Sequence, residues 1–237
     1  MTEALFREDA YRAETEAAVL ASEPRGIALD RTVFYAQGGG QSGDQGTLEL
    51  EDGTMIPIVN TVYDTDRATI LHVPVEGAAL PRAGARVIAR IDWDLRLKRM
   101  RAHTALHLLS VVAPYPVTGG SVGDAEGRLD FDSGEAVLDK ADVERRLNEL
   151  IALDAPVSHR WIADAELEAN PSLIKTMSVK PPMGTGRVRL IAIEGLDLQP
   201  CGGTHVARTG EIGPASVTGI EKKGKINRRV RIALGPA

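Results

Sequence analysis

Two short segments of the chain carry the side chains best suited to chemistry. The segment "HTALH" places His103 and His107 at i and i+4, and "CGGTH" places Cys201, the chain's one cysteine, at the same spacing before His205. Residues at this spacing on a helix lie on one face, so two imidazoles can reach one metal ion. Among the common divalent ions, zinc best suits a thiolate combined with imidazoles. The pattern therefore predicts one zinc ion per chain, bound by these four residues.

A single cysteine cannot form an internal disulfide bond. Cys201 is therefore a small buried residue, a nucleophile or a metal ligand, and the histidines around it favour the ligand. The chain has five histidines. We interpret the remaining two, His72 and His159, as ordinary polar or partly buried residues, because they lie in strand-like segments without a partner of this kind.

The histidine pair differs from that of the zinc peptidases in one position. Their HExxH motif carries a glutamate beside the first histidine as general base, whereas this chain has Thr104 there, so peptide hydrolysis by that route is not expected. Gly202 and Gly203 allow a tight turn between Cys201 and His205. Their N–H groups could face a developing oxyanion, or the glycines could only permit the turn.

Composition limits the classes of protein to consider. The chain has 237 residues, of which 43% are hydrophobic, enough for one large domain or two modest ones. No apolar run approaches the roughly 20 residues that cross a bilayer, and the charged N-terminal segment does not resemble a signal peptide. We therefore expect no membrane partner and a cytoplasmic location.

The charge is unevenly distributed. A net charge of −5 argues against nonspecific coating by nucleic acid. Basic residues nevertheless gather in "RLKRMR", residues 96–101, and in "EKKGKINRRVRI", residues 221–232. These segments indicate either a localised anionic partner or a solvated helix face and a solvated strand edge.

The pattern of apolar residues predicts an α+β chain of two domains. Residues 1–91 alternate short β-rich pieces with Gly, Pro and Asp turns, which indicates a small barrel or sandwich. A helix is expected from about residue 93 to 113, and a second helix follows a cap near Asp139. The rest of residues 92–237 mixes strands, a short helix and the loop "KPPMGTG".

Taken together, these motifs resemble a known family. The histidine pair, "PPMGTGRVRLIAIEGLD" and "DLQPCGGTHV" resemble the editing domain of alanyl-tRNA synthetases and its freestanding relatives, the alanyl-tRNA editing proteins. "FYAQGGGQSGDQGTL", with Gly38, Gly39 and Gly40, is similar to the Gly-rich motif of the longer freestanding type. The resemblance implies an N-terminal β-barrel domain, residues 1–91, followed by a zinc-dependent α+β editing domain, residues 92–237.

The resemblance also implies a hydrolase that acts in trans on mischarged tRNA(Ala). The expected substrates are chiefly Ser-tRNA(Ala) and also Gly-tRNA(Ala), cleaved at the aminoacyl ester, because a pocket for alanine cannot strongly exclude glycine or serine. Serine must be recognised by its hydroxyl, for which Thr104, Thr118 and Ser121 are candidates. Many relatives carry a threonine just before the second histidine, where this chain has Leu106.

The role of zinc is open between two mechanisms. It could lower the pKa of a bound water to about 7, which requires a free coordination position, or it could orient the aminoacyl group while a ribose hydroxyl helps to activate water. Asp197 and Gln199 either hold a ligand histidine in one tautomer or form a polar turn. The residues expected to bind tRNA phosphates are Lys222, Lys223, Lys225, Arg228 and Arg229.

The Gly-rich segment does not match a nucleotide-binding motif. It lacks both GxxxxGK[ST] and a βαβ frame, so no nucleotide cofactor is expected. It is either a hairpin loop or a loop at the domain interface that shapes the site or holds the tRNA acceptor end. Two other functions stay in view, namely a noncatalytic RNA-binding module with a structural zinc and a zinc hydrolase of another ester or amide.

Overall fold

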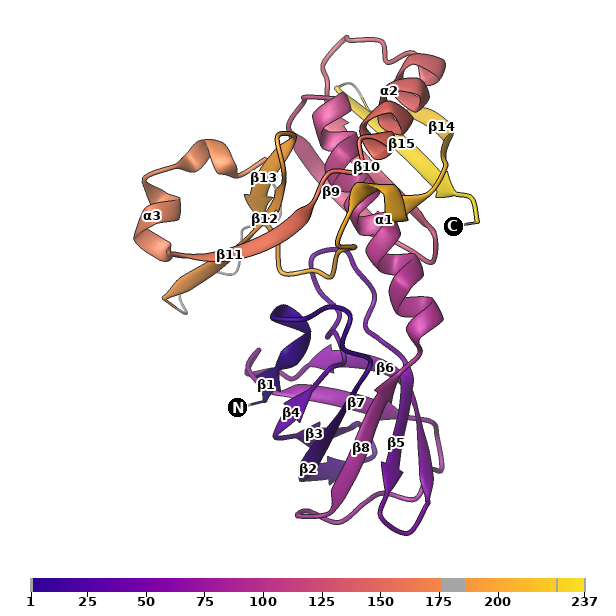
Figure 1. The fold of residues 1–237 in the computed structure, drawn as a ribbon, viewed down its shortest axis with the longest axis vertical. Coiled ribbons are helices and arrows are strands. Elements are labelled where there is room, and N and C mark those ends of the chain that lie inside the picture. Colours follow the sequence, from indigo (N-terminus) through magenta and orange to yellow (C-terminus); the bar gives the residue numbers. More distant parts are fainter. Residues whose placement is uncertain (1, 176–185, 225, 237) are drawn as a thin grey trace. The chain divides into compact units, whose positions relative to one another are not determined.

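A computed structural model describes residues 2–175, 186–224 and 226–236, and it contains two compact units, Met1–Leu97 and Lys98–Ala237 (Figure 1). The first unit holds a closed β-barrel, and the second combines helices with two antiparallel sheets. The predicted α+β class, with a barrel ahead of an α+β part, is confirmed. Part of the predicted loop "KPPMGTG" lies outside the described residues. No described helix is long and apolar enough to cross a bilayer.

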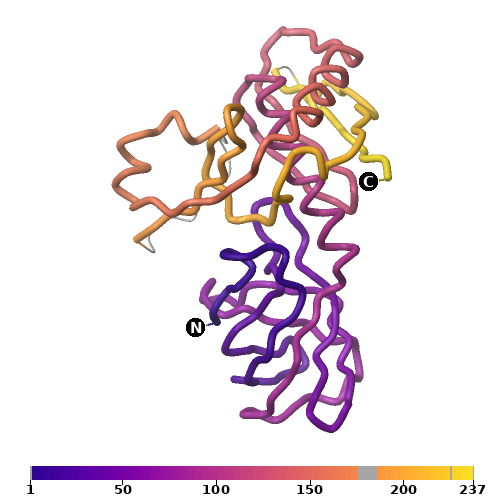
Figure 2. The backbone as a smooth tube through the Cα atoms, viewed as in Figure 1, coloured from indigo at the N-terminus to yellow at the C-terminus, as the bar shows by residue number. Residues whose placement is uncertain are grey.

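The barrel follows the strand order β2-β3-β7-β6-β5-β8, with antiparallel neighbours throughout, and its course can be traced in Figure 2. The strands are β2 (Glu14–Glu23), β3 (Gly26–Leu29), β5 (Gly46–Leu50), β6 (Met55–Tyr63), β7 (Ile70–Pro74) and β8 (Arg86–Ile91). The residues of β6 alternate, because Ile56 and Ile58 are buried while Met55 and Pro57 are exposed. This period of two lets one face of each strand fill the barrel.

Short elements complete the first unit. They are β1 (Glu3–Ala4), which pairs in parallel with β4 (Arg31–Thr32), and the 3-10 helix η1 (Leu5–Arg7).

One glycine is essential where β5 meets β8. A Cβ atom at Gly46 would lie 2.1 Å from the carbonyl oxygen of Arg90, so only glycine lets the two strands approach closely enough to pair.

The long helix α1 (Trp93–Val112) begins in the first unit. Its start is capped by Asp92, whose Oδ1 atom accepts a hydrogen bond from the Leu95 N–H at 3.1 Å. The fully buried guanidinium of Arg96 pairs with Asp44 and donates to the Val33 carbonyl at 2.6 Å. These bonds attach the first turn of α1 to the barrel.

The basic segment "RLKRMR" is therefore not a surface for an anionic partner. Arg96, Arg99 and Arg101 are all buried. Arg99 pairs with Asp124, and Arg101 donates to backbone carbonyls of Ile212 and Gly235. The sequence left two interpretations of this segment open, a surface for an anionic partner and a solvated helix face, and the burial of the three arginines contradicts both. The helical pattern shows that these residues share a helix but not which of its faces become covered.

The second unit is built around the β14-β15-β10-β9 sheet. Its strands are β9 (Val117–Val122), β10 (Glu126–Asp132), β14 (Ala215–Lys223) and β15 (Asn227–Leu234). α1 packs on one face, where a Cβ atom at Gly127 would lie 3.0 Å from the Leu106 side chain. The predicted cap Asp139 is confirmed at α2 (Lys140–Ala152). Asn148 of α2 hydrogen-bonds both backbone groups of Ala215 and so covers the edge strand β14.

A smaller sheet in the second unit leads into the cysteine segment. It has the order β11-β12-β13, with strands β11 (Val157–Ala163), β12 (Arg187–Ile193) and β13 (Asp197–Pro200). The remaining short helices are α3 (Asp164–Glu168), η2 (Pro171–Leu173) and η3 (Thr209–Ile212). Since β13 ends at Pro200, Cys201 emerges directly from the end of a paired strand.

Candidate metal and active site

The structure brings the four predicted metal ligands together. His103 and His107 come from α1, while Cys201 and His205 come from the segment after β13. Their ligand atoms all lie within 4.8 Å of one another. The Cys201 Sγ atom is 3.5 Å from Nε2 of His103 and 3.3 Å from Nε2 of His205. This group can hold a metal ion.

A buried hydroxyl orients the His205 ring. Thr104 Oγ1 donates its one hydrogen to the Met100 carbonyl at 2.9 Å and lies 3.1 Å from His205 Nδ1. The imidazole must then be the donor in that second contact. Nε2 of His205 is left with its lone pair, on the side that faces Cys201. Thr104, a predicted substrate contact, is fully buried and lies behind this ligand.

A carboxylate orients the His107 ring in the same way. Asp197 Oδ2 lies 3.1 Å from His107 Nδ1 and accepts a hydrogen bond from Gln199 at 2.6 Å. Asp197 also pairs with Lys175, and Gln199 contacts Ser110. The histidine donates from Nδ1 to the carboxylate, which leaves Nε2 available to a metal. Asp197 thus contacts a candidate ligand directly, and Gln199 contacts Asp197.

Lys175 and Ser110 were missed by sequence reasoning. Lys175 lies 22 residues before Asp197 and belongs to no recognisable motif. Ser110 follows His107 by three residues on α1, and its hydroxyl donates to the His107 carbonyl at 2.7 Å. The helical spacing could have indicated Ser110, whereas nothing in the sequence indicates the partner of Asp197.

The electrostatics of the cluster favour the metal-binding forms of Cys201 and His205, whereas a metal ion must displace a proton from His107. Burial raises the pKa of the Cys201 thiol, but the neighbouring His103 and His205 lower it well below its ordinary value. Burial lowers the pKa of His205, to about 3, so that ring is neutral. Burial also lowers the pKa of His107, but hydrogen bonds to Asp197 and Cys201 outweigh this effect and raise it to about 9. Before a cation binds, the anionic thiolate and carboxylate thus favour a proton on His107.

The two glycines of the turn differ in their surroundings. The Gly203 N–H lies 3.4 Å from the Cys201 sulfur, to which it donates. Gly202 is partly exposed, and a Cβ atom added there would meet nothing within 4 Å. One glycine amide therefore supports the thiolate, while the other borders open space beside the cluster.

Comparison with known proteins gives matches in both units of the chain. Residues 188–231, which include Cys201 and His205, match the family described as the threonyl and alanyl tRNA synthetase second additional domain. Residues 3–95 match the class II (A) tRNA synthetases. The chain is 37% identical to alanyl-tRNA editing protein AlaX-M of Methanosarcina acetivorans, over 99% of both chains. The AlaX-M protein of Saccharolobus solfataricus is 32% identical over the full length of both.

The chain belongs to the alanyl-tRNA editing protein family. Its similarity extends to larger proteins, since it is 38% identical to an alanine–tRNA ligase of Korarchaeum cryptofilum over 91% of this chain and 24% of the ligase. The family resemblance predicted from the motifs is confirmed.

The two other candidates for recognition of the serine hydroxyl lie on β9. The Thr118 hydroxyl donates to the Asp130 carbonyl at 3.1 Å. Ser121 pairs in register with Arg128 of β10, next to Gly127, which faces α1. Since neighbouring residues of a strand point to opposite faces, Ser121 lies on the sheet face away from the helix that carries the two histidines. Leu106, in the place of the family's threonine, is buried against Gly127.

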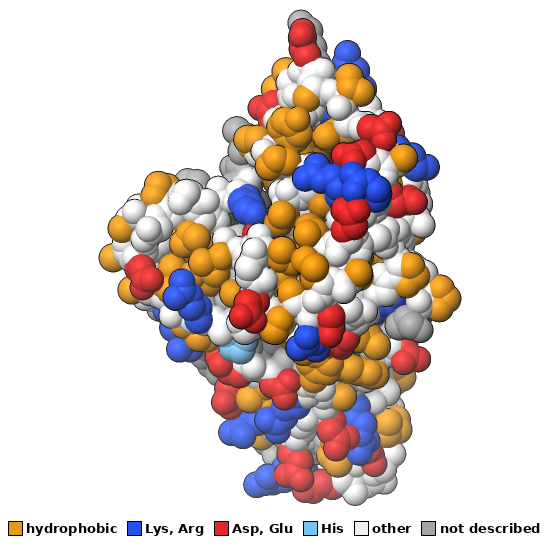
Figure 3. Space-filling view, turned by 45° about the horizontal axis from the view of Figure 1, so that its top comes forward, with side chains coloured by type: hydrophobic (Ala, Val, Ile, Leu, Met, Phe, Trp, Pro, Cys, Tyr) orange, Lys and Arg blue, Asp and Glu red, His pale blue; other side chains and the backbone are white. Residues whose placement is uncertain are grey.

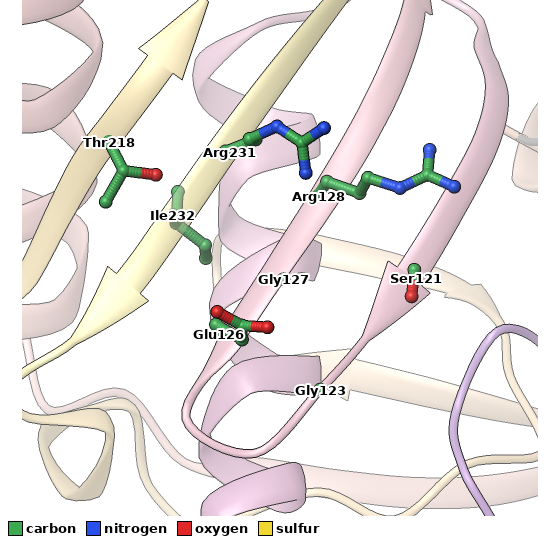
Figure 4. Close-up of a pocket in the computed structure, with 8 residues that line it drawn as sticks. All are labelled: Ser121, Gly123, Glu126, Gly127, Arg128, Thr218, Arg231 and Ile232. Carbon is green, nitrogen blue, oxygen red and sulfur yellow. The ribbon is translucent and has the colours of Figure 1, made fainter.

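That outer sheet face has a pocket of about 140 Å³ (Figure 4). Ser121, Thr218, Arg128 and Arg231 are among its lining residues. Both arginines are already paired within the chain, Arg128 with Asp130 at 2.8 Å and Arg231 with Glu221 at 2.9 Å. Both arginines that line the pocket therefore already contact a carboxylate of the chain.

The predicted phosphate-binding residues divide between the two faces of the C-terminal hairpin. Lys222 is opposite Arg228 in register, and Lys223 is opposite Asn227, so the two exposed lysines point to different faces. Arg229 makes two 2.7 Å hydrogen bonds to Asp130. Lys225 lies outside the described residues. Figure 3 likewise shows basic and acidic side chains next to one another on its visible face.

The Gly-rich motif forms a tight turn in the barrel unit. Gly38 and Gln41 pair through hydrogen bonds of 3.1 and 2.9 Å. Gly39 and Gly40 between them have φ angles of 56° and 85°, which suit a type I′ turn and favour glycine at both positions. Tyr35 holds the turn by donating to the Gly38 carbonyl at 2.8 Å.

Proposed function

We propose that this protein hydrolyses mischarged tRNA(Ala) in trans, chiefly Ser-tRNA(Ala) and also Gly-tRNA(Ala). The observation that most directly supports this proposal is a cluster of one thiolate and three imidazoles, in a chain that AlaX-M proteins match from end to end. In the reaction, a water oxygen bonds to the ester carbonyl carbon and the bond to the ribose oxygen breaks. The ribose oxygen takes up a proton, which leaves the free amino acid and uncharged tRNA.

We propose zinc as the resident metal, one ion per chain. His103, His107, Cys201 and His205 would hold it, and the donor set fits, since a soft thiolate with neutral imidazoles is the combination zinc prefers. The hydrogen bonds of Thr104 and Asp197 support this fit because they leave Nε2 of His205 and of His107 free. When bound, zinc supplies a Lewis acid that can polarise water or a carbonyl group.

The chain's own residues supply the rest of the proposed site. Asp197 and Thr104 orient the histidines, and we assign the open side of Gly202, where an added Cβ atom would meet nothing within 4 Å, to the aminoacyl group. We assign the Gly202 N–H as the donor to the developing oxyanion. Because the hydroxyls of Thr104 and Thr118 already have partners in the chain, recognition of serine by either would require a shared hydrogen bond.

One assay tests the proposed function. Purified protein is incubated with Ser-tRNA(Ala), Gly-tRNA(Ala) and Ala-tRNA(Ala), each with and without chelator. We expect hydrolysis of the first two, sparing of Ala-tRNA(Ala), and loss of activity when the metal is removed. RNA binding without hydrolysis would instead favour a structural metal module, and hydrolysis of unrelated esters alone would favour a different hydrolase.

A further inference from the structure

We infer that Arg189 is a positioning residue that holds the Cys201–Gly203 turn in its active shape. The inference rests on the proposed metal site. It concerns a residue that lies outside the two segments carrying the candidate ligands. Arg189 belongs to the segment "PPMGTGRVRLIAIEGLD" named above, but nothing in that segment indicates a role at the cysteine turn.

Arg189 is unusual for its place in the fold. It lies in the middle of β12 between the buried residues Val188 and Leu190, and only 6% of its surface is exposed. Burying a guanidinium, which stays protonated in proteins, is costly unless its N–H groups are hydrogen-bonded. A position chosen for strand packing alone would carry an apolar side chain.

The Arg189 side chain binds the metal-binding turn. Its Nη1 atom donates to the Gly203 carbonyl at 2.9 Å and to the Cys201 carbonyl at 3.2 Å. Its own carbonyl accepts from the Cys201 N–H at 3.1 Å. Backbone and side chain of one residue thus hold both ends of the cysteine–glycine–glycine segment.

The attachment point is rigid. Arg189 pairs in register with Trp161 of β11, and the next residue, Leu190, pairs with Pro200 of β13. A central strand held on both sides moves little, so the two carbonyl groups are fixed relative to the sheet. Cys201, which directly follows Pro200, is fixed with them.

Fixing these carbonyls also fixes the amides. In a trans peptide the C=O and the following N–H point in opposite directions, and no described peptide is cis. With the Cys201 carbonyl turned toward Arg189, the Gly202 N–H must point away from it. The Gly203 N–H meanwhile donates to the Cys201 sulfur. Arg189 therefore sets both the thiolate position and the direction of the Gly202 donor.

Cobalt binding tests this inference independently of catalysis. Apoprotein is titrated with Co²⁺, and the thiolate-to-cobalt absorption band and the affinity are compared for wild type, Arg189→Met, Arg189→Lys and the control Arg187→Met. Arg187 lies on the same strand but is exposed and stacks on Trp161 at 4.4 Å. We expect Arg189→Met to bind cobalt about 10- to 100-fold more weakly, with an altered band. Arg189→Lys should recover part of both, and Arg187→Met should match wild type.

Kinetics on Ser-tRNA(Ala) complete the test. Arg189→Met and Arg189→Lys should lower kcat with KM within about twofold, because the turn aligns the reacting group and does not grip the RNA. Circular dichroism confirms folding, and Arg189→Lys carries the test if Arg189→Met does not fold. Wild-type cobalt affinity and spectrum in either folded variant would overturn the inference. If wild type itself fails to hydrolyse Ser-tRNA(Ala) while the cobalt differences appear, the proposed function fails and the positioning role stands.

Discussion

At the scale of single residues, the cluster depends on hydrogen bonds that select histidine tautomers. Thr104 accepts from His205 and Asp197 accepts from His107, so each ring presents the same nitrogen, Nε2, to the cluster. Such partners matter because a ring in the other tautomer would carry a proton where a metal ion needs a lone pair.

Replacing Thr104 by valine should weaken metal binding. The substitution keeps the shape but removes the acceptor of the His205 Nδ1–H, which leaves a buried donor unsatisfied at a cost of about 1–3 kcal/mol. We expect metal affinity to fall about 10- to 100-fold, measured by competition with a chromogenic chelator. Thr104→Ser, which keeps the hydroxyl, is the control. Equal affinities for valine and wild type would show that the hydroxyl does not orient His205.

A buried histidine outside the cluster, His72, should make the barrel sensitive to acid. His72 is fully buried; its Nδ1 donates to the Ile27 carbonyl, and its Nε2 lies 2.7 Å from the Thr32 hydroxyl, from which it accepts. Burial lowers its pKa from 6.5 to about 4. Between these values the unfolded chain takes up a proton on His72 and the folded chain does not. The contribution of the neutral ring to the free energy of unfolding is therefore fully present above pH 6.5 and is lost as the pH falls toward 4.

The expected loss is up to about 1.4 kcal/mol of unfolding free energy per pH unit in that range. Urea unfolding of wild type and His72→Gln at pH 4.5, 5.5 and 7 would measure it. The difference in unfolding free energy between wild type and His72→Gln should shrink as the pH falls, because only wild type carries the titrating ring. A constant difference would contradict the assignment of a neutral buried imidazole.

At the scale of elements, the C-terminal hairpin is the candidate site for docking tRNA. Its cations are not equivalent, since Arg229 pairs with Asp130, which Arg128 also contacts, and the exposed Lys222 and Lys223 point to opposite faces. A strand presents alternate residues to alternate faces. An RNA that rests on one face can therefore contact only one of these two lysines directly.

Neutralising the lysines one at a time should identify the docking face. One of the variants Lys222→Gln and Lys223→Gln should remove a phosphate contact. For that variant we expect single-turnover deacylation to need a higher enzyme concentration for half-saturation, with an unchanged maximal rate. The log–log salt slope should fall by about 0.9 for each lost phosphate contact. Lys140→Gln, at the exposed start of α2, is the control. If neither lysine changes half-saturation, the hairpin does not dock the RNA; a collapsed maximal rate would place the lysine at the reacting centre.

At the scale of the whole molecule, the two units have separate cores, and the candidate metal cluster lies in the second unit. The barrel core includes Leu29, Phe34, Leu48 and Ile56, while all four candidate ligands belong to Lys98–Ala237. A ligand that binds the folded state alone stabilises that state in proportion to the logarithm of its concentration. Metal should therefore stabilise the second unit selectively.

Metal removal should lower the midpoint temperature of one unfolding transition and leave that of the other unchanged. We expect calorimetry to resolve two transitions, of which chelator shifts only one, and His107→Ala to reproduce that shift without chelator. At a metal concentration of about 100 times Kd the stabilisation is about 2.7 kcal/mol. Metal analysis of gently purified protein should give about one zinc per chain in wild type and much less in the variant. A chelator that shifts both transitions equally would mean that the units unfold together.

The sequence by itself determined the fold class and the four residues of the candidate metal cluster. Strand alternation in the barrel has a period of two residues, and the spacing of His103 and His107 fits the helical period of 3.6 residues. Both periods can be recognised from residues that are close together in the sequence. The spacing of Cys201 and His205 is likewise local. Thiolate and imidazole chemistry then indicated zinc with no need of coordinates.

Only the tertiary structure decided which charged groups meet. The arginines of "RLKRMR" are buried, Arg229 pairs with Asp130, Lys175 reaches Asp197, and Arg189 holds the cysteine turn. Each of these contacts joins different segments of the chain. No periodic spacing of residues in the sequence indicates that those segments meet. A charged side chain has the same sequence signature whether water, a carboxylate or a backbone carbonyl satisfies it, and strand register and helix packing alone select the partner.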